Sequence, residues 1–315
     1  METLTESMAA VAGYHFGWLD RDGSPTEAGG GKMLRPALAL LCARAVRGQA
    51  EDGIAGAVAA ELVHAYSLLH DDVMDGDRTR HHRPSVWAAF GVPSAVLVGD
   101  ALLALALRVV AESGRPAAAK AFDGLSVTVH KLIAGQSSDV AFETRATVTV
   151  PEYLAMAAGK TGALLGGACA LGAQLGGGDE EQIACLRAFG EQLGVAFQVK
   201  DDILGIRGDG RATGKPVGSD LAGRKKSLPV VVALASGTSA GEELDRLYRL
   251  DRPLTAEEVM RAVTAVETAG GTAQAEREAE WQRVGAVTRL SEANLCPEVA
   301  ASLVDIAGFV VHRDH

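Results

Sequence analysis

Hydrophobic and polar positions alternate along this chain at helical spacing almost from end to end. Apolar residues recur every three or four positions, and breaks that contain Gly or Pro separate the runs. That pattern is typical of helices that bury one face. It predicts helices over residues 37–46, 54–75, 94–112, 117–142, 151–175, 180–206, 228–235, 240–250, 256–269, 273–290 and 297–311.

The same pattern gives little sign of a sheet or of a domain boundary. Val230-Val231-Val232 could be read as a strand, but it stands alone, and strands do not alternate with helices. Thr255 precedes acidic residues and should cap the helix that follows. Because no Pro- or Ser-rich linker divides the chain, we predict a single all-α domain over residues 1–315.

Composition and charge support this interpretation and narrow the choice of partners. Of the 315 residues, 48% are hydrophobic and only 4% aromatic, a mixture that suits closely packed helices better than a β-sandwich. The formal charge of −10 argues against nucleic acid as the main partner. It still allows anionic substrates, because a local site can reverse the overall sign.

The cysteines and the N-terminal segment predict a cytoplasmic protein. Four widely spaced cysteines suggest buried thiols in a reducing compartment: Cys42, Cys169, Cys185 and Cys296. The N-terminus lacks the basic region of a signal peptide. The most apolar stretch, residues 95–110, contains Asp100 and Arg108 and looks too short and too charged to span a membrane, so no integral membrane segment is expected.

A cluster of acids lies at the end of one strongly apolar predicted helix. Asp71 and Asp75 share a helix face, and Asp72 lies beside them. Carboxylates so close would repel each other unless something compensates their charge. A hard cation such as Mg²⁺ takes oxygen ligands and often shares them with phosphate. We therefore interpret the cluster as a magnesium site rather than a solvated helix end.

Basic residues accompany this cluster. The segment from Asp77 to Pro84 includes Arg80 and His81. One arginine guanidinium can bind two phosphate oxygens at once. Near the N-terminus, Gly31, Lys32 and Arg35 lie where a helix is expected to begin, a position that suits an anion. Carboxylates beside such cations predict a diphosphate ligand.

A second pair of acids, Asp201-Asp202, repeats this arrangement. It follows Phe197-Gln198-Val199-Lys200 and precedes a stretch rich in Gly and Lys. Glycines make that stretch able to wrap a ligand. Its position after a paired aspartate suggests that at least Lys215 contacts phosphate.

Taken together, these segments resemble the trans-isoprenyl diphosphate synthases, the polyprenyl synthetase family. The match runs in the family's order from about Gly31 to Pro229, with aspartate-rich motifs DDVMD and FQVKDD. The segments GKMLRP, ELVHAYSLLHDD and GKPVGSDL also fit, as do Gly99-Asp100, Gly135-Gln136 with Asp139, Lys160-Thr161 and Lys225. Several motifs at these spacings make the resemblance specific.

The resemblance implies a fold, a reaction and an assembly. The fold would be the isoprenoid synthase bundle of antiparallel helices around a central cavity, in a homodimer. The reaction would be a prenyl transfer from an allylic diphosphate to isopentenyl diphosphate. An allylic carbocation would form as diphosphate leaves, and the double bond of isopentenyl diphosphate would attack it. The new cation would then lose a proton, with the departing diphosphate as the candidate acceptor, and an apolar cavity would exclude water.

The resemblance also implies roles for particular residues. Mg²⁺ on the allylic diphosphate would be held by Asp71, Asp72, Asp75, Asp201 and Asp202. That diphosphate would be contacted by Arg80, Lys160, Lys215 and Lys225. Isopentenyl diphosphate would be held by Gly31, Lys32, Arg35 and His64, and Gln198 would lie close to the reacting centre.

The sequence departs from the family pattern at two positions. Two arginines commonly follow the first motif, but here His81 follows Arg80 and would replace the second cation only in part. The second motif often ends in Asp, but here it ends in Gly205. Both changes bear on standard chain elongation.

Tyr66 and Ser67 occupy the positions that tune product length in the family. Ser67 is small and leaves space one helical turn before Asp71. The bulky Tyr66 lies on a different face of the same helix, so it does not have to block the cavity. This combination indicates a farnesyl-to-geranylgeranyl range, and we favour geranylgeranyl diphosphate.

Two other functions fit parts of the pattern. A terpene cyclase on the same fold would also ionise an allylic diphosphate but would not need Lys32, Arg35 or His64, all of which are present. A non-catalytic partner subunit of another synthase would be expected to have degraded aspartate motifs.

Overall fold

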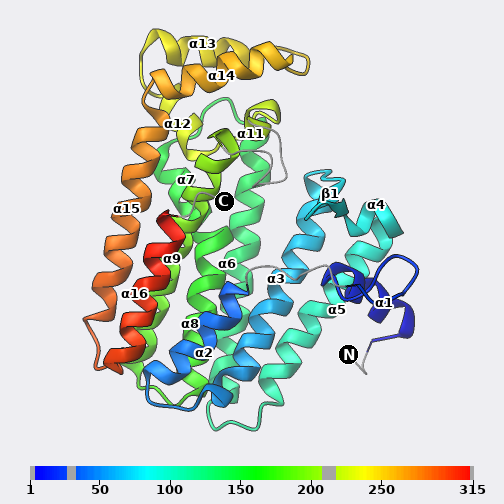
Figure 1. Cartoon of the computed structure of the whole chain (residues 1–315), viewed down its shortest axis with the longest axis vertical. Coiled ribbons are helices and arrows are strands. Elements are labelled where there is room, and N and C mark those ends of the chain that lie inside the picture. Colours follow the sequence, from blue (N-terminus) through cyan, green and yellow to red (C-terminus); the bar gives the residue numbers. More distant parts are fainter. Residues whose placement is uncertain (1–3, 27–32, 208–217, 313–315) are drawn as a thin grey trace. The chain divides into compact units, whose positions relative to one another are not determined.

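The protein is helical throughout nearly all of the chain that the structure describes. The computed structural model describes residues 4–26, 33–207 and 218–312 (Figure 1). Within these ranges the extended structure is limited to the strands β1 (Thr79–Arg80) and β2 (Arg83–Pro84) and one isolated bridge between Leu19 and Pro25. The predicted all-α class is confirmed.

The chain forms two compact units. The first consists of Met1–Val127 and Gly167–Ile183, and the second of Thr128–Gly166 and Ala184–His315. Three long helices run from one unit into the other: α6 (Ala118–Thr144), α8 (Ala163–Leu175) and α9 (Glu180–Arg207). The single domain over residues 1–315 stays a prediction.

The first unit is built around the contact between two helices. These are α3 (Ile54–Met74) and α5 (Val92–Ala111), and the His70 ring lies against Gly99 where the two helices meet. A Cβ atom at position 99 would lie 2.5 Å from Nε2 of His70, so any larger residue there would require the His70 ring to shift. The remaining elements of the unit are α1 (Glu6–His15), α2 (Leu34–Ala45), η1 (Ala50–Gly53) and α4 (Val86–Phe90).

The second unit contains a further set of helices, which contribute buried residues to its core. They are α7 (Val150–Ala157), α11 (Ser219–Ala222), α12 (Leu228–Leu234), α13 (Ser239–Tyr248), α14 (Ala256–Thr268), α15 (Gly271–Leu290) and α16 (Pro297–His312). Val230 in α12 is buried with Leu244 and Val266. The valine run is therefore helical, as expected, because burial against α13, α14 and α15 outweighs its strand propensity.

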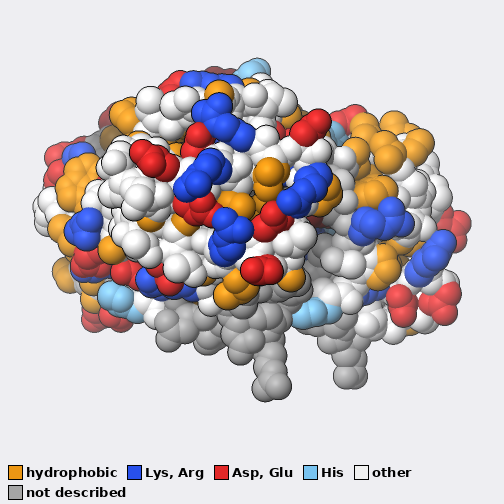
Figure 2. All heavy atoms as spheres, turned by 90° about the horizontal axis from the view of Figure 1, so that it is seen from above, with side chains coloured by type: hydrophobic (Ala, Val, Ile, Leu, Met, Phe, Trp, Pro, Cys, Tyr) orange, Lys and Arg blue, Asp and Glu red, His pale blue; other side chains and the backbone are white. Residues whose placement is uncertain are grey.

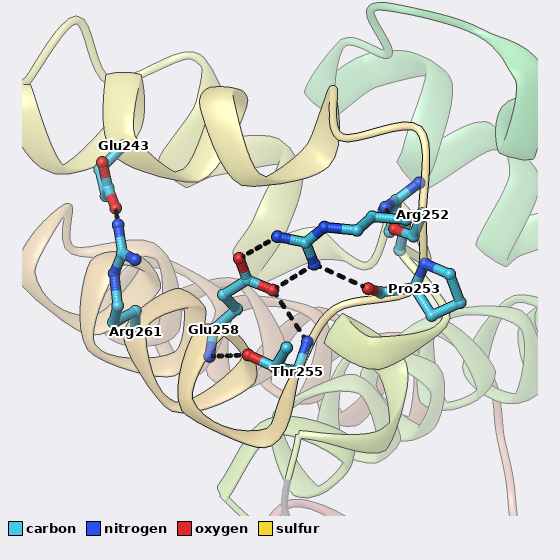
Figure 3. Close-up of polar contacts among 7 residues, drawn as sticks. Glu243, Arg252, Pro253, Thr255, Glu258 and Arg261 are labelled. Atoms are coloured by element: carbon cyan, nitrogen blue, oxygen red, sulfur yellow. Dashed lines mark hydrogen bonds and ion pairs between the residues drawn. The ribbon is translucent and has the colours of Figure 1, made fainter.

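The hairpin of α13 and α14 shows why α14 begins where the sequence predicts. Oγ1 of Thr255 accepts a hydrogen bond from the Glu258 N–H at 3.3 Å, and the Glu258 carboxylate accepts one from the Thr255 N–H at 2.9 Å (Figure 3). This reciprocal capping box confirms Thr255 as the N-cap. Arg252 binds both oxygens of Glu258, at 2.8 and 2.7 Å, and these bonds lower the pKa of Glu258 to about 2.

The long predicted helices are present, with boundaries that differ by a few residues. The largest difference lies within residues 151–175, where the segment η2 (Ala158–Gly162) is a turn of π-helix between α7 and α8. The helices α1, α4 and α11, the segment η1 and the strand pair were not predicted. Helix α5 is longer than the apolar stretch that we judged too short to span a membrane.

Among the described residues, two helical runs are long and apolar enough to cross a membrane by length and composition alone. They are Val92–Ala111 and Val150–Leu175, with mean hydropathy 2.0 and 1.3. The second window is 67% buried within the protein, as core helices of soluble proteins are. Composition of this kind does not distinguish a core helix from a membrane span.

The surface drawn in Figure 2 carries charges of both signs. Acidic and basic side chains are interspersed over this face, with hydrophobic side chains between them (Figure 2).

Candidate functional site

The first aspartate pair lies in the last turn of α3, where the two carboxylates have different surroundings. Asp71 is partly exposed, whereas Asp72 is only 2% exposed. Asp75 is the C-cap of the helix, and its N–H donates to the Asp71 carbonyl at 2.8 Å. Three acids at the negative end of a helix dipole repel one another and the dipole, so a nearby positive charge stabilises them.

Arg80 supplies part of that positive charge through an ion pair with Asp72. Its Nε donates to Oδ1 and Oδ2 of Asp72 at 2.9 and 3.1 Å, and its Nη2 donates to Oδ1 at 2.6 Å. Burial raises the pKa of Asp72, and the bonds from Arg80 act in the opposite direction. The pair holds a carboxylate that would otherwise be buried without compensation.

A short hairpin positions Arg80. Strands β1 and β2 pair antiparallel, with Arg80 opposite Arg83, and His81 and His82 form the two-residue turn. Both histidines have positive φ, 49° and 62°, as the turn types that suit such hairpins require. The Arg83 guanidinium lies over the Tyr14 ring at 4.2 Å and donates to the Leu19 carbonyl at 3.0 Å, which ties the hairpin to the segment around α1.

Several cationic or basic groups gather on the same side of the first unit. The half-buried His64 has a pKa well below its usual range because of burial first and then the charges of Arg35, His15, Arg80 and His81. Burial and the Arg80 charge likewise lower the pKa of His15 to about 4. The structure therefore brings four predicted site residues together and adds His15, which the sequence gave no reason to select.

These groups border a largely apolar cavity of about 480 Å³. Its polar side is lined by His15, Glu61, His64, Asp72, Arg80 and His81. Its apolar side comes mainly from α3 and α5 and includes Leu62, Leu68, Leu105 and Val109. Burial lowers the pKa of His81, so its charge is present only at lower pH than for an ordinary histidine, which limits His81 as a replacement for arginine.

The two residues predicted to tune product length lie on α3 but do not line this cavity. Tyr66 is 8% exposed, and its ring packs edge-on against His70 with centroids 4.7 Å apart. Ser67 donates its hydroxyl to the His64 carbonyl at 2.8 Å. His70 itself has a structural role, since its Nε2 lies 3.2 Å from the Val96 carbonyl and braces α3 against α5.

The second aspartate pair, in α9, repeats the division seen in the first. Asp201 is exposed, and Asp202 is 6% exposed. Asp202 accepts hydrogen bonds from the Tyr153 hydroxyl at 2.6 Å, the Leu228 N–H at 2.8 Å and the Gln198 amide at 3.0 Å. Burial raises the pKa of Asp202 to about 7, although these three bonds favour the charged form. Tyr153 is a site residue that the sequence analysis missed.

The π-turn η2 aligns two further predicted residues. Thr161 donates to the Gln198 Oε1 atom at 2.7 Å, which orients the amide so that its nitrogen donates to Asp202. The preceding residue, Lys160, pairs with Asp139 on α6 at 2.5 Å. A π-turn inserts an extra residue into a helix turn and is frequent at functional sites.

The carboxylates present fit a magnesium ion that is shared with a ligand. Within the described ranges, no three His, Cys, Asp or Glu side chains form a metal site by themselves. Mg²⁺ usually takes one or two carboxylates, waters and substrate phosphates instead of a complete protein cage. The more exposed acids, Asp71, Asp75 and Asp201, have the donor chemistry for this role, whereas Asp72 and Asp202 are held by protein donors.

The remaining predicted residues divide into two groups. Gly31, Lys32 and Lys215 lie outside the described residues. Lys225 is described and half-buried; its backbone N–H donates to the Asp220 carbonyl at 2.9 Å, and its carbonyl accepts from Tyr248 at 3.3 Å. Its contact with diphosphate stays a prediction.

Comparison with known proteins adds a direct test of the resemblance. The family model for polyprenyl synthetase matches residues 18–266. A geranylgeranyl diphosphate synthase of Mycobacterium tuberculosis is 45% identical over 302 residues, which cover 96% of this chain and 86% of that protein. A (2E,6E)-farnesyl diphosphate synthase of Mycobacterium bovis is 40% identical over 316 residues, covering 99% and 88%.

Solved structures agree with these relatives. A polyprenyl synthetase from Streptomyces coelicolor A3(2) superimposes with a TM-score of 0.93 at 45% identity, covering 98% of this chain and 93% of that one. A geranylgeranyl pyrophosphate synthetase from Pyrococcus horikoshii gives a TM-score of 0.83 at 34% identity, covering 90% and 86%. The predicted isoprenoid synthase fold is confirmed.

Proposed function

This chain belongs to the polyprenyl synthetase family and is a prenyltransferase with trans-prenyl diphosphate synthase activity, and on that premise we propose its substrates, metal and product. The enzyme condenses isopentenyl diphosphate with an allylic diphosphate in a Mg²⁺-dependent reaction. Its main product is geranylgeranyl diphosphate. Relatives named for geranylgeranyl and for farnesyl products support this range.

The observation that carries this proposal is the group of basic side chains beside the apolar cavity of the first unit. Arg80, His64 and His81 line the cavity, and the Arg35 charge acts on His64. A diphosphate with a short apolar tail has the matching chemistry, with anionic oxygens for the guanidinium and imidazole groups and hydrocarbon for Leu62 and Leu105. A cyclase that uses only an allylic diphosphate would have no need of this second anion site.

In this proposal the protein's own residues orient the substrates and exclude water. Gly31, Lys32, Arg35 and His64 hold isopentenyl diphosphate so that its double bond is presented to the allylic carbon. Thr161 and Asp202 fix the amide of Gln198, which places a neutral polar group close to the reacting centre. Lys160, held by Asp139, contacts the allylic diphosphate together with Arg80, Lys215 and Lys225.

Asp71, Asp75 and Asp201 provide the carboxylates for the metal. Bound Mg²⁺ would supply positive charge that stabilises the leaving diphosphate. Asp72 and Asp202 contribute less directly, because each is buried and hydrogen-bonded where it anchors its helix beside the more exposed acid. Tyr66 and Ser67 remain our basis for the product length.

The decisive experiment incubates the enzyme with Mg²⁺, isopentenyl diphosphate and, in turn, dimethylallyl, geranyl and farnesyl diphosphate, followed by sizing of the products. We expect a twenty-carbon diphosphate to accumulate, and Asp71→Asn to abolish its formation. Chelation of the metal should have the same effect as that substitution. Asp245→Asn, which removes an acid of α13 paired with Arg249, serves as the matched control.

The same experiment separates the alternatives. Hydrocarbon formed from an allylic diphosphate alone would identify a terpene cyclase. No turnover until a second synthase chain is added would identify a partner subunit. A fifteen-carbon product would keep the reaction and correct only the product length.

We also propose that the enzyme acts as a homodimer in the cytoplasm. Helix α6 has exposed apolar side chains at Val127, Ile133 and Val140, which are 53%, 44% and 38% exposed in the single chain. Exposed apolar side chains of this kind favour a protein interface. Light scattering coupled to gel filtration should give twice the chain mass, and Ile133→Asp should reduce it to the mass of one chain.

A further inference from the structure

We propose that the Ser85 hydroxyl is a further substrate contact of this enzyme and donates a hydrogen bond to the diphosphate of isopentenyl diphosphate. This inference rests on the proposed function, because it adds a residue to the cavity that we assign to that substrate. It concerns only residues of the first unit, and Ser85 lies outside the sequence motifs from which the site was predicted.

Ser85 lies at the junction between the hairpin and α4, on the wall of the cavity that His64 and His81 also line. It is buried, with only 2% of the residue exposed. Its backbone is held on both sides, because its N–H donates to the Arg78 carbonyl at 2.9 Å and its carbonyl accepts from the Ala89 N–H at 3.0 Å. The side chain of Ser85 therefore starts from a fixed position on the cavity wall.

The end of α1 supports this part of the wall. The Tyr14 hydroxyl donates to the Pro84 carbonyl at 2.8 Å, one residue before Ser85. The Arg83 guanidinium lies 4.2 Å from the centroid of the Tyr14 ring and strengthens the same contact. The residue after Tyr14 is His15, which lines the cavity as well. Ser85 and His15 therefore lie on adjoining parts of the wall.

The Ser85 side chain does not make the bond that its position at a helix start favours. Ser85 is the N-cap of α4, with φ −63° and ψ 159°. Thr149, Thr238 and Thr255 are N-caps with similar extended angles, and each side chain accepts a bond from the first turn of its helix. Ser85 makes no such bond. Ser227, which precedes α12, also makes none, but it belongs to the second unit and does not line this cavity.

The Ser85 hydroxyl is buried without a hydrogen-bond partner. Within the part of the chain that the structure describes, no protein group bonds to Oγ of Ser85. A buried hydroxyl that is left unbonded costs free energy, and the large majority of such groups in folded proteins have a partner. On the wall of a binding cavity, the ligand can supply that partner.

Isopentenyl diphosphate has its hydrogen-bond acceptors at one end only. All its oxygen atoms belong to the diphosphate group, and its hydrocarbon part accepts no such bond. A serine hydroxyl in this cavity therefore bonds to a diphosphate oxygen, and bonds to a charged oxygen are stronger than neutral ones. Burial lowers the pKa of His64 and of His81, so the hydroxyl adds a donor that does not depend on protonation of these histidines.

The test measures the binding of each substrate without turnover. Isothermal titration calorimetry follows isopentenyl diphosphate in the presence of Mg²⁺ and farnesyl thiolodiphosphate, whose bridging sulfur resists ionisation, so that no prenyl transfer occurs. We expect Ser85→Ala to weaken the binding of isopentenyl diphosphate by about tenfold, as loss of one hydrogen bond to a charged group does. The affinity for farnesyl thiolodiphosphate, titrated separately, should stay unchanged.

The matched control is Thr272→Val, at the start of α15. Thr272 is 1% exposed and, among the described residues, its Oγ1 is unbonded like Oγ of Ser85, but it does not line the cavity. This substitution removes the same kind of hydroxyl and should leave both affinities unchanged. In steady-state assays, Ser85→Ala should raise the KM for isopentenyl diphosphate and leave kcat unchanged, as loss of uniform binding does.

Thermal unfolding of the substrate-free enzyme separates this role from a structural one. Because the free enzyme gives the hydroxyl no partner, Ser85→Ala should unfold at the same temperature as the wild type or at a higher one. A capping role predicts the opposite result, a lower unfolding temperature, because loss of a serine N-cap destabilises its helix.

Each outcome gives a decision. Wild-type affinity for isopentenyl diphosphate in Ser85→Ala would overturn the inference even if the enzyme elongates prenyl chains normally, and it is the result expected if the hydroxyl binds only water. Weaker binding with a lower unfolding temperature, or an equal loss in Thr272→Val, would also overturn it. Weaker binding of this substrate alone, in a variant as stable as the wild type, would support it. If that loss is found but the wild type forms no elongated product, the Ser85 contact stands and the proposed reaction fails.

Discussion

The two aspartate pairs share one plan but hold their buried members by different means. In each pair the first acid is the more exposed and the second is buried, with Asp72 and Asp202 only 2% and 6% exposed. Asp72 is held by a single charged partner, Arg80, whereas Asp202 is held by three neutral donors from α7, α9 and α12. A buried carboxylate can thus be stabilised by one strong ion pair or by several weaker hydrogen bonds. We expect loss of the ion-pair partner to destabilise the fold more than loss of any one of the hydrogen bonds.

The largest expected effect is the loss of the charged partner. Arg80→Ala leaves Asp72 buried without compensation and should lower the free energy of unfolding by about 3–5 kcal/mol, as removal of one member of a buried ion pair does. Urea denaturation monitored by circular dichroism measures this change. Arg78→Ala, in the same segment, removes only a contact with the Trp87 ring at 5.3 Å and is the matched control. A loss below about 1 kcal/mol for Arg80→Ala would place the pair among surface ion pairs.

Removing one of the neutral donors should have a smaller effect. Tyr153→Phe deletes the 2.6 Å bond to Asp202 but leaves the bonds from Gln198 and the Leu228 N–H. We expect a loss of about 1–3 kcal/mol in the free energy of unfolding, measured as for Arg80. Tyr248→Phe, which removes a hydroxyl bonded to a backbone carbonyl at 3.3 Å, is the control. A loss as large as that of Arg80→Ala would contradict the distributed arrangement.

The basic surroundings of the first pair should also make stability depend on pH. Burial and the charge of Arg80 lower the pKa of His15 to about 4, and His81 adds to this effect, while His64 lies near enough for His15 to affect its pKa. A lowered histidine pKa means that the unfolded chain binds the proton more readily, so this contribution is present above about pH 6.5 and is lost as the pH falls toward 4.

His15→Gln should therefore flatten the fall in the free energy of unfolding over that range. The slope that one such group contributes approaches about 1.4 kcal/mol per pH unit. Denaturation at several pH values between 4 and 7 gives the slope for each protein. His312→Gln, at the exposed end of α16, should leave it unchanged. An unchanged slope in His15→Gln would show that His15 takes up its proton in the folded protein as readily as in the unfolded chain.

The smallest expected effect concerns the hairpin turn that presents Arg80. His82 has a φ of 62°, a conformation that glycine adopts without the steric strain of a side chain. His82→Gly should raise the free energy of unfolding by up to about 1 kcal/mol and leave turnover unchanged. His81→Gly relieves similar strain but removes an imidazole that lines the cavity, so it should raise the KM for isopentenyl diphosphate. Equal KM values for the two variants would show that His81 does not contribute to binding isopentenyl diphosphate.

The sequence predicted the long helices and most of the acidic site because those features are local. Apolar residues at a spacing of three or four fix which face of a helix is buried, and paired acids are visible without any structure. The strand pair was missed because two histidines are not a usual hairpin turn, and both have positive φ, which residues other than glycine adopt uncommonly.

Other site residues were missed because tertiary contacts alone define them. Tyr153 reaches Asp202 from a distant segment, and no local pattern marks this tyrosine as different from others. The π-turn that brings Thr161 to Gln198 changes the hydrogen-bond spacing of a helix without changing its apolar pattern.

The π-turn has a consequence for how far the sequence of this enzyme can drift. A Cβ on Gly135 would lie 2.1 Å from the Lys160 backbone nitrogen, and one on Gly194 would lie 2.5 Å from the Gly162 Cα. The backbone around η2 is therefore in contact with α6 on one side and α9 on the other, with no room for a methyl group between them. Only glycine fits at Gly135 and Gly194, whereas Gly114 and Gly237 have open space around them and are restricted instead by their positive φ of 68° and 66°.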